Sequence, residues 1–376
     1  MSTKSLEITA RNLVKFENGA LIAGKWNIVR MLGTGAFGVV YKVSDNRVKA
    51  NCLYAMKTEK YTPKNVLKVE VKVLSMAFRR KMKHFLKLFE SGTCKGGIKG
   101  EYLIYIVMEL AGASIDALRR LRPSRRFTLL CALTIGIQFI GAIEELHQLG
   151  YQHRDIKAAN FAIGDVLEGA EDQSPRKNFY VIDFGLCRAI IDSSGNLRPP
   201  RKAAPFRGTV RYAPLNCHIL RETCRKDDLE SWLYSQIEYT RGSLPWRDLN
   251  NIVDVGLYKE RCRHDIGLGE LMGGCPRQYI KILRYLDSLR YYDKPDYEHI
   301  RSLLRDAGKI FGSFRPTYDW IDEGLQGGNG NAGVTVTEQT QASQVTQVSG
   351  SLKPTPPIGT PQPSPKPASQ QAPPKN

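Results

Sequence analysis

The hydrophobic pattern of this chain changes at about residue 112, and the change limits the folds that are open to it. Before that point most patterned segments are typical of strands, with alternating or β-rich residues: Trp26–Leu32, Val39–Val43, Leu53–Thr58 and Tyr102–Glu109. After it the patterned segments are mainly helical: Ile115–Leu121, Leu129–Leu149, Asp227–Tyr239 and Tyr279–Ser288. A strand-rich part followed by a helical part predicts an α+β fold with two lobes.

Each part also contains a short exception to its own pattern. In the strand-rich part, several apolar residues share one helical face within Asn65–Ala77. In the helical part, Phe161–Ile163 and Tyr180–Ile182 are short and strand-like. We therefore expect a strand-rich N-lobe over about residues 24–112 and a helical C-lobe over about residues 113–322.

Composition changes again near Gly324, and the segment that follows is not expected to fold. From there to the end of the sequence there is no Phe, Tyr or Trp, and nine of the 20 prolines lie between Pro354 and Pro374. Such a segment buries too little apolar surface to fold alone. We predict a disordered tail rich in Pro, Gln, Ser and Thr over residues 323–376, and an N-terminal extension over residues 1–23.

The net charge of +18, from 55 Lys+Arg against 37 Asp+Glu, limits the classes of molecule that we expect the protein to bind. The tail contributes little of this charge, so the folded part is basic. Its cations gather in three clusters: Arg79–Lys83, Arg119–Arg126 and Arg198–Lys226. Such an excess suits nucleic acid, an anionic membrane surface, or an acidic or phosphorylated substrate. Because no motif interleaves basic with aromatic residues, we do not expect nucleic-acid binding.

The cysteines and the hydropathy of the chain indicate the cellular compartment in which we expect the protein. The eight cysteines are scattered without a C-x-x-C pair, and residues 1–16 lack the apolar core of a signal peptide. The most apolar stretch, Thr128–Ile143, is shorter than the roughly 20 residues of a membrane span, so it predicts a buried helix. We expect reduced thiols, no zinc site, no membrane anchorage, and a cytoplasmic location, with the nucleus as a second one.

A glycine-rich turn joins the first two predicted strands. Gly33, Gly35 and Gly38 leave room for backbone N–H groups to approach a phosphate. The spacing alone also fits a dinucleotide-binding fold, which needs a helix directly after the glycines and an acid about 20 residues on. Here a strand follows the glycines, and Lys57 stands at that distance in a strand-like segment, Tyr54–Lys57. We therefore expect a nucleotide-phosphate loop with Lys57 on the phosphates.

Glu70 lies thirteen residues after Lys57, within the predicted helix. Taken alone, Glu70 is equally well explained as a solvated surface charge. With the glycines and Lys57 in place, an ion pair between Lys57 and Glu70 becomes the better prediction. Such a pair would hold the lysine against the α- and β-phosphates of a nucleotide.

The most specific signals are the motif H-R-D-I-K-A-A-N and, further along, D-F-G after a short strand. Phosphoryl transfer needs positioning and charge neutralisation more than covalent chemistry. In the first motif, Asp155 would accept the proton of a substrate hydroxyl and Lys157 would neutralise charge on the transferred group. Asn160 and Asp183, from the two motifs, would bind Mg²⁺. A lone D-F-G is common in loops, but all these elements in this order predict phosphoryl transfer.

Together these motifs resemble those of a protein kinase across about residues 24–320. The resemblance implies ATP and Mg²⁺ as cofactors, protein substrates, and a site around the adenine. The residues of that site would be Val40, Ala55 and Met108, with the backbone of Glu109, Leu110 and Ala111 as the hinge. Lys157 together with Thr209 resembles the Ser/Thr-specific pattern, in which Thr209 hydrogen-bonds towards Asp155 and Lys157. Asp228 resembles the buried helix acid that holds the catalytic-loop backbone.

Several segments further resemble the casein kinase 1 group and, within it, the tau-tubulin kinase family. These segments are Asn65–Val71, Asn160–Ala162, Arg198–Arg201, Phe206–Ala213, Asp227–Ser231, Gly242–Trp246, Lys294–Tyr297 and Asp319–Trp320. This resemblance places Ala162 on the floor of the adenine site and Arg211 in an anion site, although Leu257 lies near where a lysine is expected. The chain departs from the usual pattern of the family, with Ala158 in place of a proline and no Glu after Ala-Pro. These departures indicate a divergent but active member of the family.

Two further expectations concern partners. The basic cluster Arg198–Lys226 covers the activation segment and either attracts acidic or phosphorylated substrates or is merely solvated. The tail carries P-x-x-P spacings such as Pro354–Pro357, which suit SH3 or WW domains, although a plain disordered tail explains them as well. We expect a monomeric Ser/Thr kinase. The competing interpretation is a catalytically weak, kinase-fold binding or scaffold protein.

Overall fold

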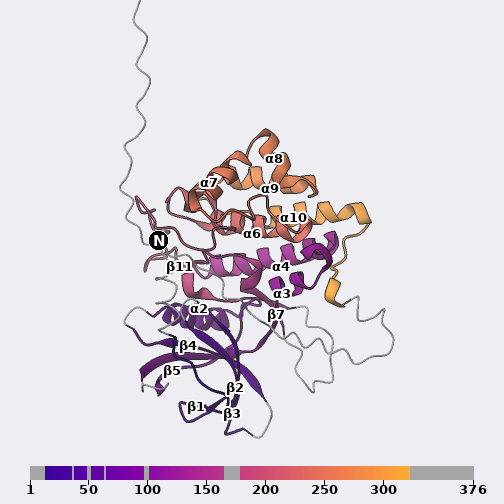
Figure 1. Ribbon diagram of the computed structural model, residues 1–376. Coiled ribbons are helices and arrows are strands. Elements are labelled where there is room, and N and C mark those ends of the chain that lie inside the picture. Colours follow the sequence, from indigo (N-terminus) through magenta and orange to yellow (C-terminus); the bar gives the residue numbers. More distant parts are fainter. Residues whose placement is uncertain are drawn as a thin grey trace, which may run out of the picture.

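The computed structural model describes residues 13–35, 38–48, 52–62, 65–96, 101–164 and 178–321. Within them the chain forms two lobes, with the large sheet at one end and most of the helices at the other (Figure 1). This arrangement confirms the expected α+β fold with two lobes. The expected tail, residues 323–376, and the start of the N-terminal extension, residues 1–12, lie outside the described residues.

Six antiparallel strands form the sheet of the N-lobe, in the spatial order β1-β2-β3-β4-β6-β5. Their bounds are β1 Leu21–Ile22, β2 Trp26–Thr34, β3 Val39–Asp45, β4 Leu53–Lys60, β5 Leu88–Gly96 and β6 Glu101–Glu109. One face buries Tyr41, Met56 and Val107 in a core of its own. The other face carries Ile106, which joins the main core together with Leu74 of the helix α2, Leu67–Arg79.

Helix α2 begins two residues later than the apolar spacing predicts, because side chains rather than helical turns hold the chain before it. Buried Asn65 accepts the N–H of Thr62 at 2.7 Å and donates to the carbonyl of Lys60 at 2.8 Å. The Glu59 carboxylate accepts the N–H of Leu67 at 3.1 Å, which satisfies a donor at the helix N-terminus. These bonds anchor α2 to the end of β4 and fix its place on the sheet.

The hydrophobic pattern does not predict β5, the strand at the edge of the sheet. Its residues include two glycines, and its side chains alternate only between partly buried and exposed, so no strong apolar period marks it. The strand forms because it pairs along its length with β6, from Leu88 opposite Met108 to Gly96 opposite Glu101. Pairing with a neighbour has overridden weak local propensity.

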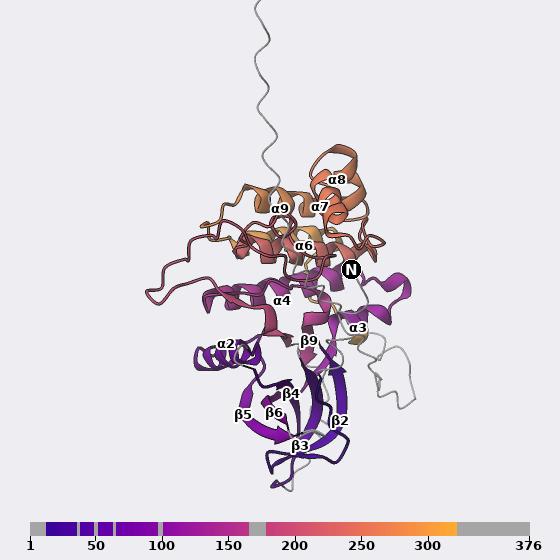
Figure 2. The ribbon, with the colours of Figure 1, turned by 60° about the vertical axis from the view of Figure 1, so that its left-hand side comes forward.

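The C-lobe is built around α4 (Leu129–Gln148), which packs against α6 (Arg225–Arg241) and α10 (Tyr297–Gly308). Figure 2 shows α6 above α4. Helix α4 is the one described helix long and apolar enough to cross a membrane, yet 61% of its most apolar window is buried inside the protein, as a core helix requires. The other helices are α3 Ile115–Arg120, α5 Leu215–His218, α7 Ile252–Arg261, α8 Asp265–Met272 and α9 Arg277–Ser288, with short 3-10 turns at Pro123–Arg125 (η1) and Lys309–Phe311 (η4).

Short elements at the junction of the lobes hold the motif residues. A three-stranded sheet contains β7 Ala111–Ser114, β9 Phe161–Gly164 and β10 Phe179–Val181, and a two-stranded one contains β8 Tyr151–Gln152 and β11 Arg188–Ala189. The 3-10 turns here are η2 Ala158–Asn160 and η3 Phe184–Leu186. The N–H of Ile182 donates to the carbonyl of Asn160 at 2.9 Å, which places the two motif segments side by side.

Candidate active site

Lys57, Glu70 and Asp183 meet where β4, α2 and the segment after β10 converge. The Lys57 ammonium lies 2.8 Å from Oε2 of Glu70 and 2.9 Å from Oδ1 of Asp183. Only 2% of the Glu70 side chain is exposed, whereas 49% of the Asp183 side chain is. Burial alone would lower the pKa of Lys57, but the two carboxylates raise it, so the ammonium stays charged. The structure therefore places a buried ion pair on one side of Lys57 and a more accessible carboxylate on the other.

A second cluster joins Asp155, Lys157 and Thr209. Nζ of Lys157 lies 2.8 Å from Oδ2 of Asp155 and donates to Oγ1 of Thr209 at 2.9 Å. The Thr209 hydroxyl donates to Oδ1 of Asp155 at 2.8 Å, and its backbone N–H donates to the same oxygen at 2.9 Å. Gly208 has a φ of 97°, and a Cβ there would lie 2.5 Å from the carbonyl oxygen of Arg154, so only glycine brings Thr209 this close. The Asp155 carboxylate is held in one orientation.

Asn160 and Asp183 offer oxygen atoms of the kind that Mg²⁺ binds. Nδ2 of Asn160 donates to the carbonyl of Asp155 at 2.8 Å, while Lys57 and the N–H of Gly185 both donate to Oδ1 of Asp183. These bonds occupy Nδ2 of Asn160 and Oδ1 of Asp183, so the amide oxygen of Asn160 and the second oxygen of Asp183 can face a cation. Both are hard oxygen ligands of the kind that Mg²⁺ prefers. Burial would raise the pKa of Asp183, but Lys57 holds it well below its usual range. The donor set fits a divalent cation.

The backbone around Asp155 is held by Asp228, near the start of α6. The Asp228 carboxylate accepts the N–H of His153 at 2.7 Å and that of Arg154 at 2.9 Å. Burial would raise the pKa of Asp228, but hydrogen bonds from His147, 2.9 Å away, and from the His153 backbone lower it, so the carboxylate stays ionised. Arg154 has a φ of 67°, an unusual conformation for a bulky residue, and this anchor stabilises it.

The three glycines of the phosphate loop differ in what the fold requires of them. A Cβ on Gly38 would lie 1.9 Å from the carbonyl oxygen of Thr58, so β3 and β4 can approach only with glycine there. A Cβ on Gly35 would meet nothing closer than the carbonyl of Gly38 at 3.9 Å. Gly33 lies in β2, paired with Val40 of β3. Packing therefore explains Gly38, whereas Gly35 has no packing explanation.

The residues expected around the adenine lie on β3, β4, β6, β7 and β9 and on the hinge between β6 and β7. Ala55 of β4 pairs with Met108 of β6, and both are buried. The N–H of Glu109 donates to the carbonyl of Lys87 at 2.9 Å, so this hinge donor is already occupied. The remaining members of the set, partly or fully buried, are Val40, Leu110, Ala111 and Ala162.

Arg211 stands apart from these clusters. Its guanidinium lies 3.4 Å from Oε1 of Glu238 and donates to the carbonyl of Arg247 at 3.2 Å, with 41% of the side chain exposed. Leu257, on the outer face of α7, is 61% exposed. Arg211 is therefore a partly neutralised, accessible cation, and position 257 adds no positive charge.

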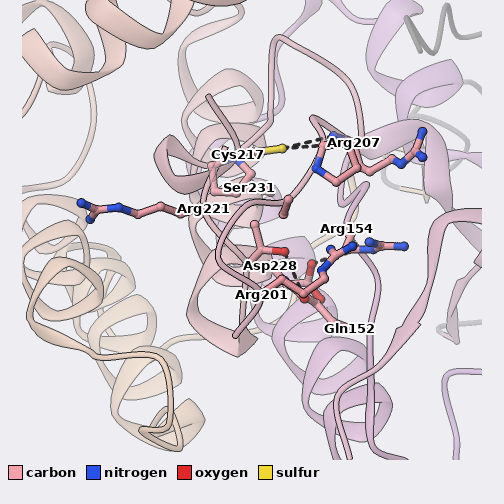
Figure 3. A pocket seen from close by; sticks show the side chains of 12 residues that line it. Gln152, Arg154, Arg201, Arg207, Cys217, Arg221, Asp228 and Ser231 are labelled. Carbon is pink, nitrogen blue, oxygen red and sulfur yellow. Dashed lines mark hydrogen bonds between the residues drawn. The ribbon is translucent and has the colours of Figure 1, made fainter. Parts of the chain in front are cut away.

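Four arginines of the basic cluster and the first motif line a pocket beside the catalytic loop: Arg154, Arg201, Arg207 and Arg221. In Figure 3, Arg154 and Arg207 extend towards one side of the pocket and Arg221 towards the other. Arg201 pairs with buried Glu222, but no carboxylate among the described residues pairs with the other three. Burial and the neighbouring cations, Arg201 and Arg207 among them, lower the pKa of Arg154 to about 10. The pocket carries unneutralised positive charge.

The sequence alone does not reveal two buried charges of the C-lobe, Glu222 and Lys259. The Glu222 side chain is 3% exposed and pairs with both Arg188 and Arg201, which ties the activation segment to the chain before α6. Lys259, on α7, is fully buried. Both residues stand among polar neighbours in the sequence, as ordinary surface charges do. Only the packing of distant segments over them removes them from water.

Comparison with known proteins identifies the family. Residues 26–249 match the protein kinase domain. A probable serine/threonine-protein kinase of Dictyostelium discoideum is 37% identical over 309 residues, which are 82% of this chain and 58% of that protein. The serine/threonine-protein kinase spe-6 of Caenorhabditis elegans is 36% identical over 288 residues, 75% of this chain and 72% of that protein. A putative serine/threonine-protein kinase of the same organism is 34% identical over 311 residues, 81% and 83% of the two chains.

The chain belongs to the protein kinase family, as its motifs predict. Members of this family transfer the γ-phosphoryl group of ATP with the help of Mg²⁺. The chain spans 58% of the length of the Dictyostelium relative. Its assignment to the casein kinase 1 group and to the tau-tubulin kinase family stays a prediction.

Proposed function

We propose that this chain is an active serine/threonine kinase that uses ATP and Mg²⁺ to phosphorylate proteins. The observation that carries the proposal is that both charge clusters are assembled at once. Lys57 holds Glu70 and Asp183, and Asp155 is fixed by Lys157 and Thr209 within 3 Å of each. A protein that had lost the reaction would have no need to keep buried charges in this arrangement, because burying charge is costly.

In the proposed reaction the second cluster handles the substrate hydroxyl. The Asp155 carboxylate accepts the hydroxyl proton as the oxygen attacks the γ-phosphorus and the bond to the leaving ADP oxygen breaks. Lys157, at ion-pair distance from Asp155, offsets the negative charge of the transferred phosphoryl group. The bond from Lys157 to Thr209 supports a preference for Ser and Thr over Tyr, in line with the resemblance that the sequence shows.

The first cluster handles the nucleotide. Lys57 binds the α- and β-phosphates, and Glu70 keeps its ammonium in place from the buried side. Asn160 and Asp183 would hold Mg²⁺, which would neutralise charge on the phosphates. Gly33, Gly35 and Gly38 bring backbone N–H groups over the phosphates. Val40 and Ala55 from one side, Ala162 from the other, Met108 and the hinge Glu109–Ala111 would hold the adenine, as the resemblance implies.

We also propose that the chain is a divergent member of the casein kinase 1 group, similar to the tau-tubulin kinase family. One departure from the common kinase pattern is the lack of a glutamate after Ala213-Pro214. In its place Glu230 of α6 accepts the N–H of Leu215 at 2.9 Å and pairs with Arg263 at 2.7 Å. The carboxylate anchor of this segment is thus supplied by a helix, so the departure leaves the fold of the active site intact.

The proposed substrates are acidic or already phosphorylated proteins. The argument rests on the unneutralised cations of the arginine pocket, Arg154, Arg207 and Arg221, which lie beside the motif that contains Asp155. Arginine forks bind phosphate and carboxylate groups in two-point contacts. Arg211 adds a further accessible cation in the anion site that the resemblance implies.

The remaining proposals rest on the sequence alone. We propose a cytoplasmic location with the nucleus as a second one, a monomeric state, and SH3- or WW-domain partners for the tail around Pro354–Pro357, which lies outside the described residues. These proposals are independent of the catalytic one.

The competing function is that of a kinase-fold binding or scaffold protein. Phosphotransfer from ATP to a degenerate library of Ser, Thr and Tyr peptides, wild type beside Asp155→Asn, separates the two. An enzyme gives a wild-type signal on Ser and Thr peptides that falls by about a thousandfold in Asp155→Asn, because the carboxylate acceptor is gone. Equal signals from the two proteins would refute the enzymatic function.

A further inference from the structure

Lys259 is the buried cation that the proposed reaction leaves unexplained. Its Nζ donates to the carbonyls of Val210 at 2.8 Å and Ala213 at 2.7 Å, and lies 3.0 Å from Nε2 of His218. The ammonium also lies over the ring of Tyr234, 4.9 Å from its centroid. Among the described residues no carboxylate is within ion-pair distance of Nζ. Burial lowers the pKa of Lys259 well below its usual value, so these contacts offset only part of the lost hydration of the ammonium.

His218 completes the set of acceptors only in its neutral form. Nδ1 of His218 lies 2.7 Å from the carbonyl of Ile252, so it carries the ring proton and leaves Nε2 to accept from Lys259. Burial, with the neighbouring positive charge of Lys259, lowers the pKa of His218 to about 4. The three N–H bonds of the ammonium thus meet two carbonyls and one imidazole nitrogen.

The carbonyls that this ammonium binds belong to one turn of backbone. The N–H groups of Tyr212 and Ala213 both donate to the carbonyl of Thr209 at 2.9 Å, as in a single helical turn. Carbonyls at the end of such a turn have no partner within it and carry partial negative charge, which a cation offsets. Trp246 donates its indole N–H to the intervening carbonyl of Arg211 at 2.8 Å.

This turn begins at the residue that orients the proposed catalytic base. Thr209 gives Asp155 both its hydroxyl and its backbone N–H. A shift of the turn would therefore change two hydrogen bonds of Asp155 at once. Since Lys259 contacts neither Asp155 nor the nucleotide-phosphate cluster, any effect on the reaction must pass through the turn.

We propose that Lys259 is a positioning residue for the kinase reaction, which fixes the turn 210–213 from the C-lobe and through it the orientation of Thr209 and Asp155. The inference rests on the proposed kinase activity but not on the proposed preference for acidic substrates. It adds a buried residue outside every recognised motif to those that the reaction needs.

The test compares wild type with Lys259→Met, which keeps the apolar stem and removes the donors. We expect kcat for a peptide that the wild type phosphorylates to fall about tenfold or more, while KM for ATP stays within about twofold, because the nucleotide cluster is untouched. Lys259→Gln, which retains an N–H donor, should recover part of the loss. Lys281→Met, the same change on the exposed face of α9, serves as the matched control and should leave both parameters unchanged.

Two results would overturn the proposal. One is a kcat in folded Lys259→Met within about twofold of wild type. The other is a fall in kcat matched by an equal loss of ATP affinity, which is the mark of general damage. If Lys259→Met does not fold, Trp246→Phe removes the indole donor to the same turn, together with part of a buried ring, and should lower kcat about threefold at constant KM for ATP. An unchanged kcat in that variant would count against the proposal. An inactive wild type would instead refute the proposed function.

Discussion

At the scale of single residues, the closest backbone approach in the N-lobe depends on Gly38. The gap between this residue and the carbonyl of Thr58 admits a hydrogen but no carbon, whereas Gly35, three residues earlier in the same loop, faces open space. Gly38→Ala should therefore lower the free energy of unfolding by about 1–3 kcal/mol as β3 is pushed from β4. Gly35→Ala is the matched control and should change it by less than about 1 kcal/mol. Chemical denaturation of the two variants checks this, and equal stability would contradict it.

A second prediction at this scale concerns the pH dependence of stability through His218. Its pKa is about 4 in the folded protein, against an ordinary value of 6.5. Between these values the unfolded chain binds the proton more readily, so stability is full above pH 6.5 and is lost as the pH falls towards 4. His218→Asn removes this group but retains a donor towards Ile252. When the pH is lowered from 7 to 4.5, the free energy of unfolding of the variant should fall by about 1–2 kcal/mol less than that of the wild type.

Denaturant unfolding of both proteins at the two pH values measures the difference. The control is His299→Asn, because His299 lies on the exposed face of α10. That variant should follow the wild-type pH dependence. If His218→Asn also follows it, His218 does not titrate as the contacts with Lys259 and Ile252 require.

At the scale of elements, α4 begins with a cap supplied partly from the far end of the domain. Oδ2 of Asp319 accepts the N–H of Thr128 at 2.8 Å, and Oδ1 accepts the Thr128 hydroxyl at 2.6 Å, which in turn caps the N–H of Cys131. Because α4 is the core helix of the C-lobe, Asp319→Ala should destabilise the domain by about 1–2 kcal/mol. Thermal unfolding measures this. Asp306→Ala, at an exposed α10 site where Asp306 pairs with Lys309, should have almost no effect. A loss for Asp319→Ala as small as that for Asp306→Ala would contradict the role of the cap.

The elements also show how far local sequence determines this fold. Long helical patterns in the sequence predicted α4, α6 and α9 to within about two residues. Helices α7 and α8, with 10 and 8 residues and several glycines, are short and form because the C-lobe packs around them. Strand β5 depends on β6 in the same way. Where stability comes from a partner distant in the sequence, the local pattern carries little information.

At the scale of the whole molecule, the contacts of the candidate site also divide into those that the local sequence predicts and those that depend on distant segments. The pairing of Lys57 with Glu70 was predictable because a strand and the next helix place residues thirteen apart on facing surfaces. The contact of Thr209 with Asp155 spans 54 residues and was predictable only through family resemblance. Lys259 and Glu222 were not predictable at all, since their burial arises from segments that meet only in the folded chain. Part of the basic excess likewise gained a location, in the arginine pocket.

That location leads to a prediction for the molecule as a whole. Two peptides with the same phosphorylatable serine, one flanked by acidic and one by neutral residues, should differ in kcat/KM by about tenfold in favour of the acidic one at low salt. Raising the ionic strength should reduce this ratio, because screening weakens attraction between exposed charges. Arg207→Ala and Arg211→Ala should each lower kcat/KM on the acidic peptide several-fold and leave the neutral peptide unchanged. Equal losses on both peptides would show that the basic face is merely solvated.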